Sequence, residues 1–202
     1  AYITNTTPTI EFQVKDTDSG VNAGTIAVTV DGTVVSTVTK TAIDGGYKCT
    51  CTSPTLKDGS HTISVKASDN DGNAATAKTA TFTVDTVPPT LQITAPSNNL
   101  ITNKKTVTVS GKTDDVSSKP VTVTVNGATA TVGTDGTFTK DVTLAEGANT
   151  ITIVAKDKAG KTTTVTRKVT VDTSAPVIKS VTLTPNPVDC GKTFIIAVEI
   201  TD

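Results

Sequence analysis

The sequence of 202 residues has no Met and no Trp, a single His, and only 3% aromatic residues. A lone His without a partner is a poor general base or metal ligand, so we interpret His61 as structural. Sugar-binding faces usually stack their ligand on exposed aromatic rings, and the few rings here are needed in a core built from Val, Ile, Leu and Ala. We therefore predict no catalytic residue, no bound organic cofactor, and no enzyme activity in this chain.

Charge of one sign and long apolar runs are also missing. The chain carries 18 basic and 19 acidic residues, and no basic cluster suggests a nucleic-acid partner. No apolar run approaches the length of a membrane span, and no stretch shows the apolar spacing of a helix. The sequence has no initiator Met and no secretory signal, so we expect it to be a piece of a longer protein.

The chain has only three cysteines, which cannot all pair. Cys49 and Cys51 are two positions apart on a predicted strand, so both face the same side and cannot be bridged without distortion. They share the face of Tyr47, and we predict that they are small buried residues of the core. Cys190 lies in a predicted turn, where a disulfide to another chain would be accessible to it.

A long internal repeat is the strongest positive feature. The segment 83–89, TVDTVPP, returns 87 positions later as 170–176, TVDTSAP. A recurrence of this length is typical of stacked modules with one architecture. We predict module one at residues 1–87 with its first strand largely missing, module two at residues 88–173, and the first strands of an incomplete third module at 174–202.

Thr, Val and Ile dominate the sequence and favour β-strands, because β-branched side chains suit a pleated surface. Two alternating segments run into Asp31-Gly32 and Asn126-Gly127, which are strong hairpin signals. About seven short strands in each module, separated by turns every eight to twelve residues, predict an all-β chain of tandem immunoglobulin-like sandwiches.

Residues 88–173 resemble the bacterial immunoglobulin-like modules of cell-surface proteins, secreted glycosidases and phage virion proteins. The matching motifs are Val109-Ser110-Gly111, Val125-Asn126-Gly127, Gly136-Thr137-Phe138 and the segments 144–149 and 155–160. Residues 9–87 look like a sister version that departs from the pattern around residues 49–54. The resemblance implies a non-catalytic spacer, adhesive or scaffold role and names no ligand.

Acidic turns are the best candidates for chemistry in this sequence. In a sandwich of this kind, the turns after the second strand and before the last strand share one end, at which the chain also enters. The candidate metal-ligating residues of module two are Asp85, Asp114, Asp115 and Asp157, and those of module one are Asp16, Asp18, Asp69 and Asp71.

Carboxylates around a hinge can hold Ca²⁺, which takes six to eight oxygen ligands. The alternative is that Asp occupies these turns because its side chain bonds the local backbone. By the same repeat, Asp172 corresponds to Asp85, and Asp202 corresponds to Asp115.

Three functions remain open from the sequence. The first is a non-catalytic spacer or adhesive repeat of an exported bacterial surface protein. The second is a subunit of an extracellular filament or phage tail that assembles by strand exchange. The third is an accessory module of a secreted polysaccharide-degrading enzyme. In each case the expected location is extracellular, at a cell surface or virion, and the expected partners are neighbouring immunoglobulin-like modules of the same or another copy.

Overall fold

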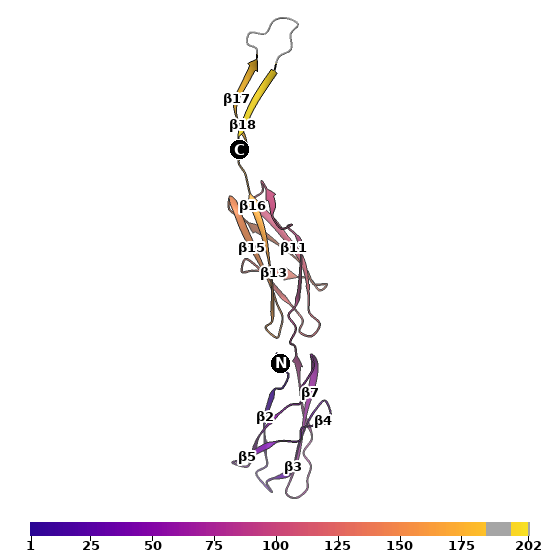
Figure 1. Ribbon diagram of the computed structural model, residues 1–202. Coiled ribbons are helices and arrows are strands. Elements are labelled where there is room, and N and C mark those ends of the chain that lie inside the picture. The colour runs from indigo at the N-terminus through magenta and orange to yellow at the C-terminus, as the bar shows by residue number, and fades with distance from the viewer. Residues whose placement is uncertain (185–194, 202) are drawn as a thin grey trace.

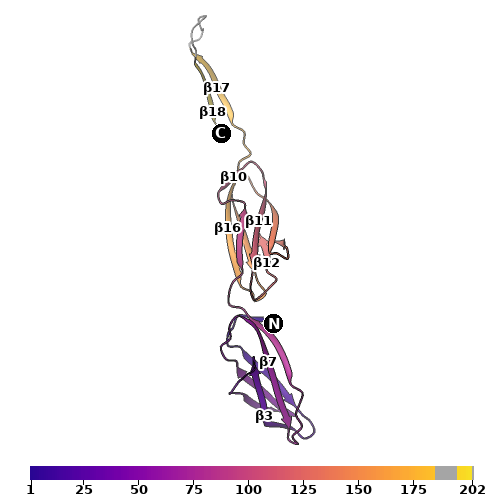
Figure 2. The same cartoon turned by 90° about the vertical axis from the view of Figure 1, so that its right-hand side faces the viewer.

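The computed structural model describes residues 1–184 and 195–201, and all regular structure in these residues is β-strand. No helix that could span a membrane occurs in this part of the chain. Figure 1 shows two sandwiches and a final hairpin that follow one another along one long axis. The view from the side in Figure 2 has the same order, so the extended arrangement is not an effect of projection.

The first sandwich is made of β1–β8, which form a five-stranded sheet in the order β1-β8-β7-β3-β4 and a three-stranded sheet in the order β2-β6-β5. The strands have the following bounds: β1 Tyr2–Ile3, β2 Thr9–Lys15, β3 Val21–Val30, β4 Thr33–Val34, β5 Thr39–Ile43, β6 Gly46–Thr52, β7 Gly59–Asp69 and β8 Lys78–Val84.

The second sandwich is made of β9–β16, and its two layers are joined through one strand. The strand β13 pairs with β12 through Ala128 to Ala130 and with β14 through Thr131 and Val132, so it passes from one layer to the other. The strands have the following bounds: β9 Thr90–Ala95, β10 Leu100–Thr102, β11 Thr106–Asp114, β12 Thr122–Val125, β13 Ala128–Val132, β14 Thr137–Thr143, β15 Gly147–Lys156 and β16 Thr162–Val171.

A two-stranded hairpin follows, with β17 at Val177–Thr184 and β18 at Ile195–Thr201. Its large apolar side chains are exposed, and Ile195 reaches 71%. The all-β class and the tandem sandwiches predicted from the sequence are confirmed. Each sandwich has eight strands rather than seven, because β1 and β10 each add a short strand that pairs in parallel with the last strand of its sandwich.

The cores are aliphatic, as the composition predicted. In the second sandwich, alternate residues of each strand point inward, so that Val123, Ile151 and Ile153 are fully buried around Phe138. The first sandwich has two smaller clusters, and Cys51 and Cys49 each belong to one of them.

Both cysteines of β6 are buried and free, as expected, and burial raises the pKa of each thiol. One expected core aromatic is not buried: Tyr2 is 42% exposed, because β1 lies at the edge of its sheet. Cys190 and Phe194 lie outside the described residues.

Both predicted hairpin turns are formed as expected. Asp31 and Asn126 have φ values of 51° and 47°, and the glycines that follow them have φ values of 80° and 81°. Two consecutive residues with positive φ are typical of a two-residue hairpin turn, whose twist matches that of the flanking strands. These turns set the register of β3 and β12 and so decide which side chains face the core.

Gly111 tests how tightly the second sandwich is packed. A Cβ at this position would lie 2.5 Å from the Gln92 carbonyl oxygen and 2.8 Å from the Phe138 ring. We expect Gly111→Ala to destabilise the second sandwich by about 1–3 kcal/mol, because neither a backbone nor a buried ring can move freely.

Calorimetry of the whole chain measures this loss. Both tyrosines lie in the first sandwich, so tyrosine fluorescence should report an unchanged first transition. Lys112→Ala, at the exposed neighbouring position, is the control and should leave both transitions in place.

Candidate functional site

The linker between the two sandwiches, residues 85–89, is held at its start by the first sandwich. Asp85 is the first residue after β8, and its N–H donates to the Ile3 carbonyl at 2.9 Å. The next residue, Thr86, donates through both its N–H and its hydroxyl to the Asp58 carboxylate at 3.0 Å. The exit of the chain from the first sandwich is therefore fixed by hydrogen bonds on two consecutive residues.

Asp115 is the first residue after β11 and organises the loop that follows. Its Oδ1 accepts the N–H groups of Ser117 at 2.8 Å and Ser118 at 2.7 Å. A short acidic side chain commonly bonds the backbone two or three residues ahead in this way. This contact turns the loop so that Ser118, which is fully buried, faces the linker.

Asp157 is the first residue after β15 and closes the turn into β16. Its Oδ1 accepts the Lys161 N–H at 2.8 Å, and its own N–H donates to the Lys161 carbonyl at 3.1 Å. The other carboxylate oxygen, Oδ2, is buried and has no hydrogen-bond partner among residues 1–184 and 195–201. Most buried carboxylate oxygens have a hydrogen-bond partner, so this atom is exceptional.

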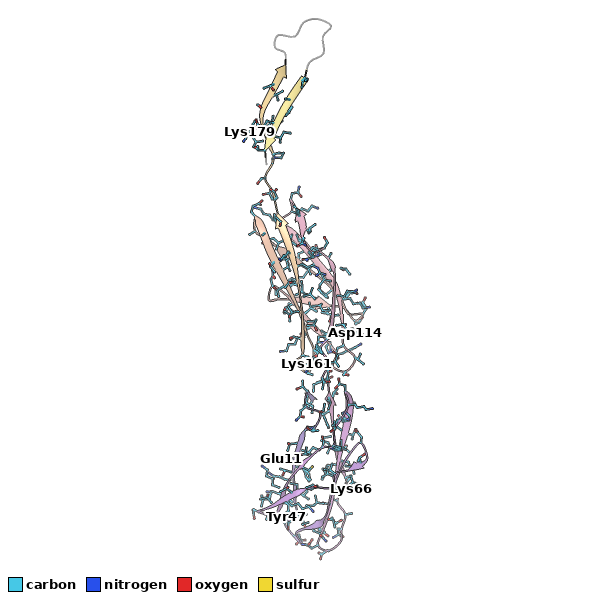
Figure 3. All side chains as sticks on the ribbon, in the orientation of Figure 1. Glu11, Tyr47, Lys66, Asp114, Lys161 and Lys179 are labelled. Atoms are coloured by element: carbon cyan, nitrogen blue, oxygen red, sulfur yellow. The ribbon has the colours of Figure 1, made fainter. Side chains whose placement is uncertain are left out.

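These three aspartates meet in one place, which we call the carboxylate cluster (Asp85, Asp115 and Asp157). One carboxylate oxygen from each lies within 4.8 Å of those of the other two. Their exposed fractions are 1%, 5% and 6%, respectively. The Ser118 hydroxyl donates to Asp85 Oδ2 and links the two sandwiches directly. In Figure 3 the labelled Asp114 and Lys161 mark the end of the second sandwich that meets the first.

The structure brings together three of the four residues that the sequence proposed for module two. Asp114 lies outside the cluster: its side chain is 60% exposed and pairs with Lys119 at 2.8 Å. This ion pair, followed by the Asp115 N–H, lowers the pKa of the Asp114 carboxyl. Because successive strand residues face opposite sides, Asp114 and Asp115 cannot both point inward at the end of β11.

The four acidic residues proposed for module one are not gathered in the same way. Asp16 binds within its own turn, to the Asp18 N–H and the Ser19 hydroxyl. Asp69 uses both oxygens on Asn73, at 2.7 Å each, and the Asn73 side-chain amide is the largest cause of its lowered pKa. Within residues 1–184 and 195–201, no group of three acidic side chains that includes Asp16, Asp18, Asp69 or Asp71 comes as close as the carboxylate cluster.

A shallow cleft opens at the same junction. It has a volume of about 350 Å³ and is lined on one side by Asp58, Val87 and Pro88 and on the other by Asp114 and Val116. Asp85 and Asp115 also contribute to its wall. Two of the three cluster residues therefore lie at the wall of a solvent-open cleft, while Asp157 is not part of its lining.

The start of the next linker repeats the first. The Asp172 N–H donates to the Thr102 carbonyl at 2.9 Å, as Asp85 does to Ile3. Thr173 donates to the Glu146 carboxylate at 2.8 Å and 2.7 Å, as Thr86 does to Asp58, and these bonds lower the pKa of Glu146. Asp202, the predicted equivalent of Asp115, lies outside the described residues.

His61 has a partner that the sequence analysis missed. Its Nδ1 lies 2.6 Å from Asp31 Oδ2 and its Nε2 lies 2.7 Å from the Lys57 carbonyl oxygen. Both neighbours are acceptors, so the ring satisfies both only when it is doubly protonated. Burial alone would lower the pKa of His61, but the bonds to Asp31 and Lys57 raise it above its ordinary value.

Residues 1–86 match the family described as bacterial Ig-like domain, and residues 89–173 match glucodextranase, domain B. The chain carries two immunoglobulin-like domains in tandem. This confirms the resemblance noted from the sequence motifs of the second domain and its sister.

Among curated proteins, the chain is similar to bacillopeptidase F of Bacillus subtilis (strain 168), with 34% identity over 140 residues. The match covers 69% of this chain and 9% of the relative, so the chain spans a small part of that protein.

Among solved structures, two three-domain immunoglobulin fragments of titin, one of them named as an I-band fragment, align with a TM-score of 0.52 and 12% identity. Each alignment covers 89% of this chain and 64% of the titin fragment. At this identity the likeness concerns the fold alone.

The His61–Asp31 pair predicts a pH dependence for the first domain. The pKa of His61 is raised in the folded state, so its stabilising effect is complete below the unfolded pKa of about 6.5. That effect is lost as the pH rises through the folded pKa. We expect the first-domain Tm, followed by tyrosine fluorescence, to fall by a few degrees between about pH 6 and pH 9.

His61→Asn is the matched variant, because Asn149 of the second domain likewise bonds the carbonyl four residues earlier. The His61→Asn variant should show a smaller fall of the first-domain Tm between about pH 6 and pH 9. A fall as large as that of the wild type would show that His61 is not the source of the pH dependence.

Proposed function

We propose that this chain is a non-catalytic, semi-rigid spacer of an exported bacterial protein, and that it separates or orients the parts on either side. The observation that carries the proposal is the hydrogen-bonded exit of each sandwich. Asp85 and Thr86 are tied to the first domain, and Asp172 and Thr173 are tied to the second by equivalent bonds. Hydrogen bonds that fix the direction in which the chain leaves each sandwich restrict the angle between neighbouring domains, which is a mechanical effect.

The linker adds to this stiffness. Pro88 and Pro89 fix φ near −65° and keep the preceding residues extended. Pro89 is buried, and its carbonyl accepts the Thr163 hydroxyl at 2.5 Å, so the linker is also tied to the second domain. The proposed module boundaries, 1–87, 88–173 and 174–202, place both hinges directly after such fixed segments.

A second candidate function is an accessory region of a secreted enzyme. It is favoured by the match of residues 89–173 to glucodextranase, domain B, and by the similarity to bacillopeptidase F. In this second candidate function, the spacer positions a catalytic domain that belongs to the same polypeptide. A hydrolase domain encoded in the same reading frame would support it, and a frame made only of further immunoglobulin-like repeats would favour a surface stalk.

The filament or phage-tail alternative is favoured by one observation, the apolar side chains exposed on the final hairpin. Ile178, Val181 and Ile200 are each 57% exposed or more. Strand addition between copies would extend this two-stranded sheet, and packing of the extended sheets against one another would cover these side chains. Size-exclusion chromatography with light scattering separates the alternatives, because a spacer stays monomeric and a strand-exchanging subunit forms oligomers that lengthen with concentration.

The spacer function predicts that linker stiffness can be removed without unfolding either domain. In Val87→Gly/Pro88→Gly both substituted positions are exposed, and glycine frees the backbone. We expect a broader distance distribution with a shorter mean in small-angle X-ray scattering, with both Tm values unchanged. Pro54→Gly, at an exposed loop position inside the first domain, is the control. An unchanged distribution in the linker variant would contradict a stiffness set by the linker.

A further inference from the structure

The carboxylate cluster gathers three buried acidic groups at the junction of the two domains. None of the ion pairs among residues 1–184 and 195–201 reaches Asp85, Asp115 or Asp157. The nearest lysine ion pair joins Lys119 to the exposed Asp114 instead. We propose that Asp85, Asp115 and Asp157 bind one Ca²⁺ ion and that this ion cross-links the two domains.

Like charges at this separation repel, and burial strengthens the repulsion. The donors that reach the three carboxylates are neutral: backbone N–H groups of Val87, Ser117, Ser118 and Lys161, and the Ser118 hydroxyl. Hydrogen bonds from neutral groups lessen the cost of burial but leave the net charge in place. A divalent cation removes most of that charge at the point where the carboxylates converge.

The spacing of the oxygens fits a shared ion. Calcium–oxygen distances are 2.3–2.6 Å, so two ligands of one Ca²⁺ lie at most about 5 Å apart. One oxygen of each cluster residue lies within 4.8 Å of the others. The three side chains come from three separate segments, one of them a linker, and Ca²⁺ accepts such irregular geometry more readily than Mg²⁺, which requires a near-ideal octahedron.

A comparison within the chain points to the ligand atom. Asp69 and Asp157 both close the turn before the last strand of their domain by accepting the N–H four residues ahead. In the first domain the second oxygen of Asp69 is bonded by the Asn73 amide. In the second domain Lys161 stands in place of Asn73, and Asp157 Oδ2 has no partner and is buried. The turn geometry is therefore the same, and only the Asp157 oxygen is left available for a metal.

The serine contacts show a second difference of the same kind. Ser19 donates to Asp16 within its own loop. Ser118 makes the equivalent contact to Asp115 at 3.3 Å and, in addition, reaches across the junction to Asp85. Asp85 is thereby drawn into the second domain, where it completes the cluster. Because the ligands belong to both domains, binding depends on their relative orientation and must in turn stabilise that orientation.

The binding experiment uses the whole chain and Ca²⁺ alone. In isothermal titration calorimetry we expect one site, within the range of extracellular calcium modules, about 10⁻⁴–10⁻³ M or tighter. Saturating Ca²⁺ should raise Tm by about 5 °C. The proposal would be overturned if neither heat of binding nor a change in Tm were seen at Ca²⁺ concentrations up to about ten times the upper end of that range of dissociation constants. Equally tight binding of Mg²⁺ would overturn the assignment to calcium.

Asp157→Asn is the decisive variant, because it keeps the Oδ1 bond to Lys161 and changes only the unpartnered atom. We expect it to weaken Ca²⁺ binding at least about tenfold, since each lost carboxylate removes one negative charge from the site. In EDTA its Tm should equal or exceed that of the wild type, because one repelling charge is gone, and this shows that the variant is folded. Asp115→Asn should behave in the same way.

Asp114→Asn is the matched control, because it removes an exposed carboxylate next to the cluster. Its affinity for Ca²⁺ should stay within about threefold of the wild type, the change expected for a screened surface charge. Equal losses in Asp114→Asn and Asp157→Asn would overturn the cluster as the site and indicate general attraction of cations to the junction.

The mechanical consequence of binding rests on the proposed spacer function and is measured separately. Ca²⁺ should narrow the scattering distance distribution of the Val87→Gly/Pro88→Gly variant, because the ion restores a connection that the linker has lost. Calorimetric binding without this narrowing would keep the metal site and reject its role in stiffness. Failure of binding would reject the site and leave the spacer function to the linker.

Discussion

The fold depends on paired layers of alternating β-branched residues whose inward faces exclude water. With no Trp or Met and few aromatic rings, each core is thin and aliphatic. A thin core leaves little side-chain volume to cover the two ends of a sandwich, where strands stop and backbone groups lose their partners. Aspartates immediately after the strands supply these missing acceptors, and this explains why Asp85, Asp115 and Asp157 stand where they do.

The same residues acquire a second property where two domains meet. An aspartate that caps a free turn remains in contact with water, so its charge costs little. At the junction the opposite domain covers the turn, and the charge becomes buried. The carboxylate cluster thus arises from local turn chemistry placed at an interface. The position of Asp85, on the linker itself, couples that chemistry to the angle between the domains.

The two domains share one architecture but differ in the hydrogen bonds of equivalent polar residues. His61 of the first domain bonds the Lys57 carbonyl and the turn residue Asp31. Asn149 of the second domain bonds only the nearby backbone, and Asn126 of its hairpin turn carries no charge. The single histidine of the chain, with its raised pKa, therefore belongs to the first domain. Domains with the same backbone course therefore respond differently to solution conditions.

Much of the fold was readable from the sequence because side-chain alternation is a local property. The period of two, the Asp-Gly and Asn-Gly turns and the 87-residue repeat required strands, hairpins and tandem sandwiches. The inward phase of β11 also contained the signal that separates Asp115 from Asp114, since Asp115 is in step with Val109 and Gly111. The two aspartates are adjacent in the sequence, and only this phase distinguishes the inward Asp115 from the exposed Asp114.

The sequence by itself determined the β class, the tandem arrangement and the presence of acidic residues after the strands, because these follow from periodicity and turn chemistry within a few residues. Only the tertiary structure decided which oxygens are occupied. Whether Asp157 Oδ2 or Asp69 Oδ2 is free, and whether His61 reaches Asp31, depends on distances between segments far apart in the chain. Those distances are fixed by strand register and by the approach of the two domains, which no local pattern records.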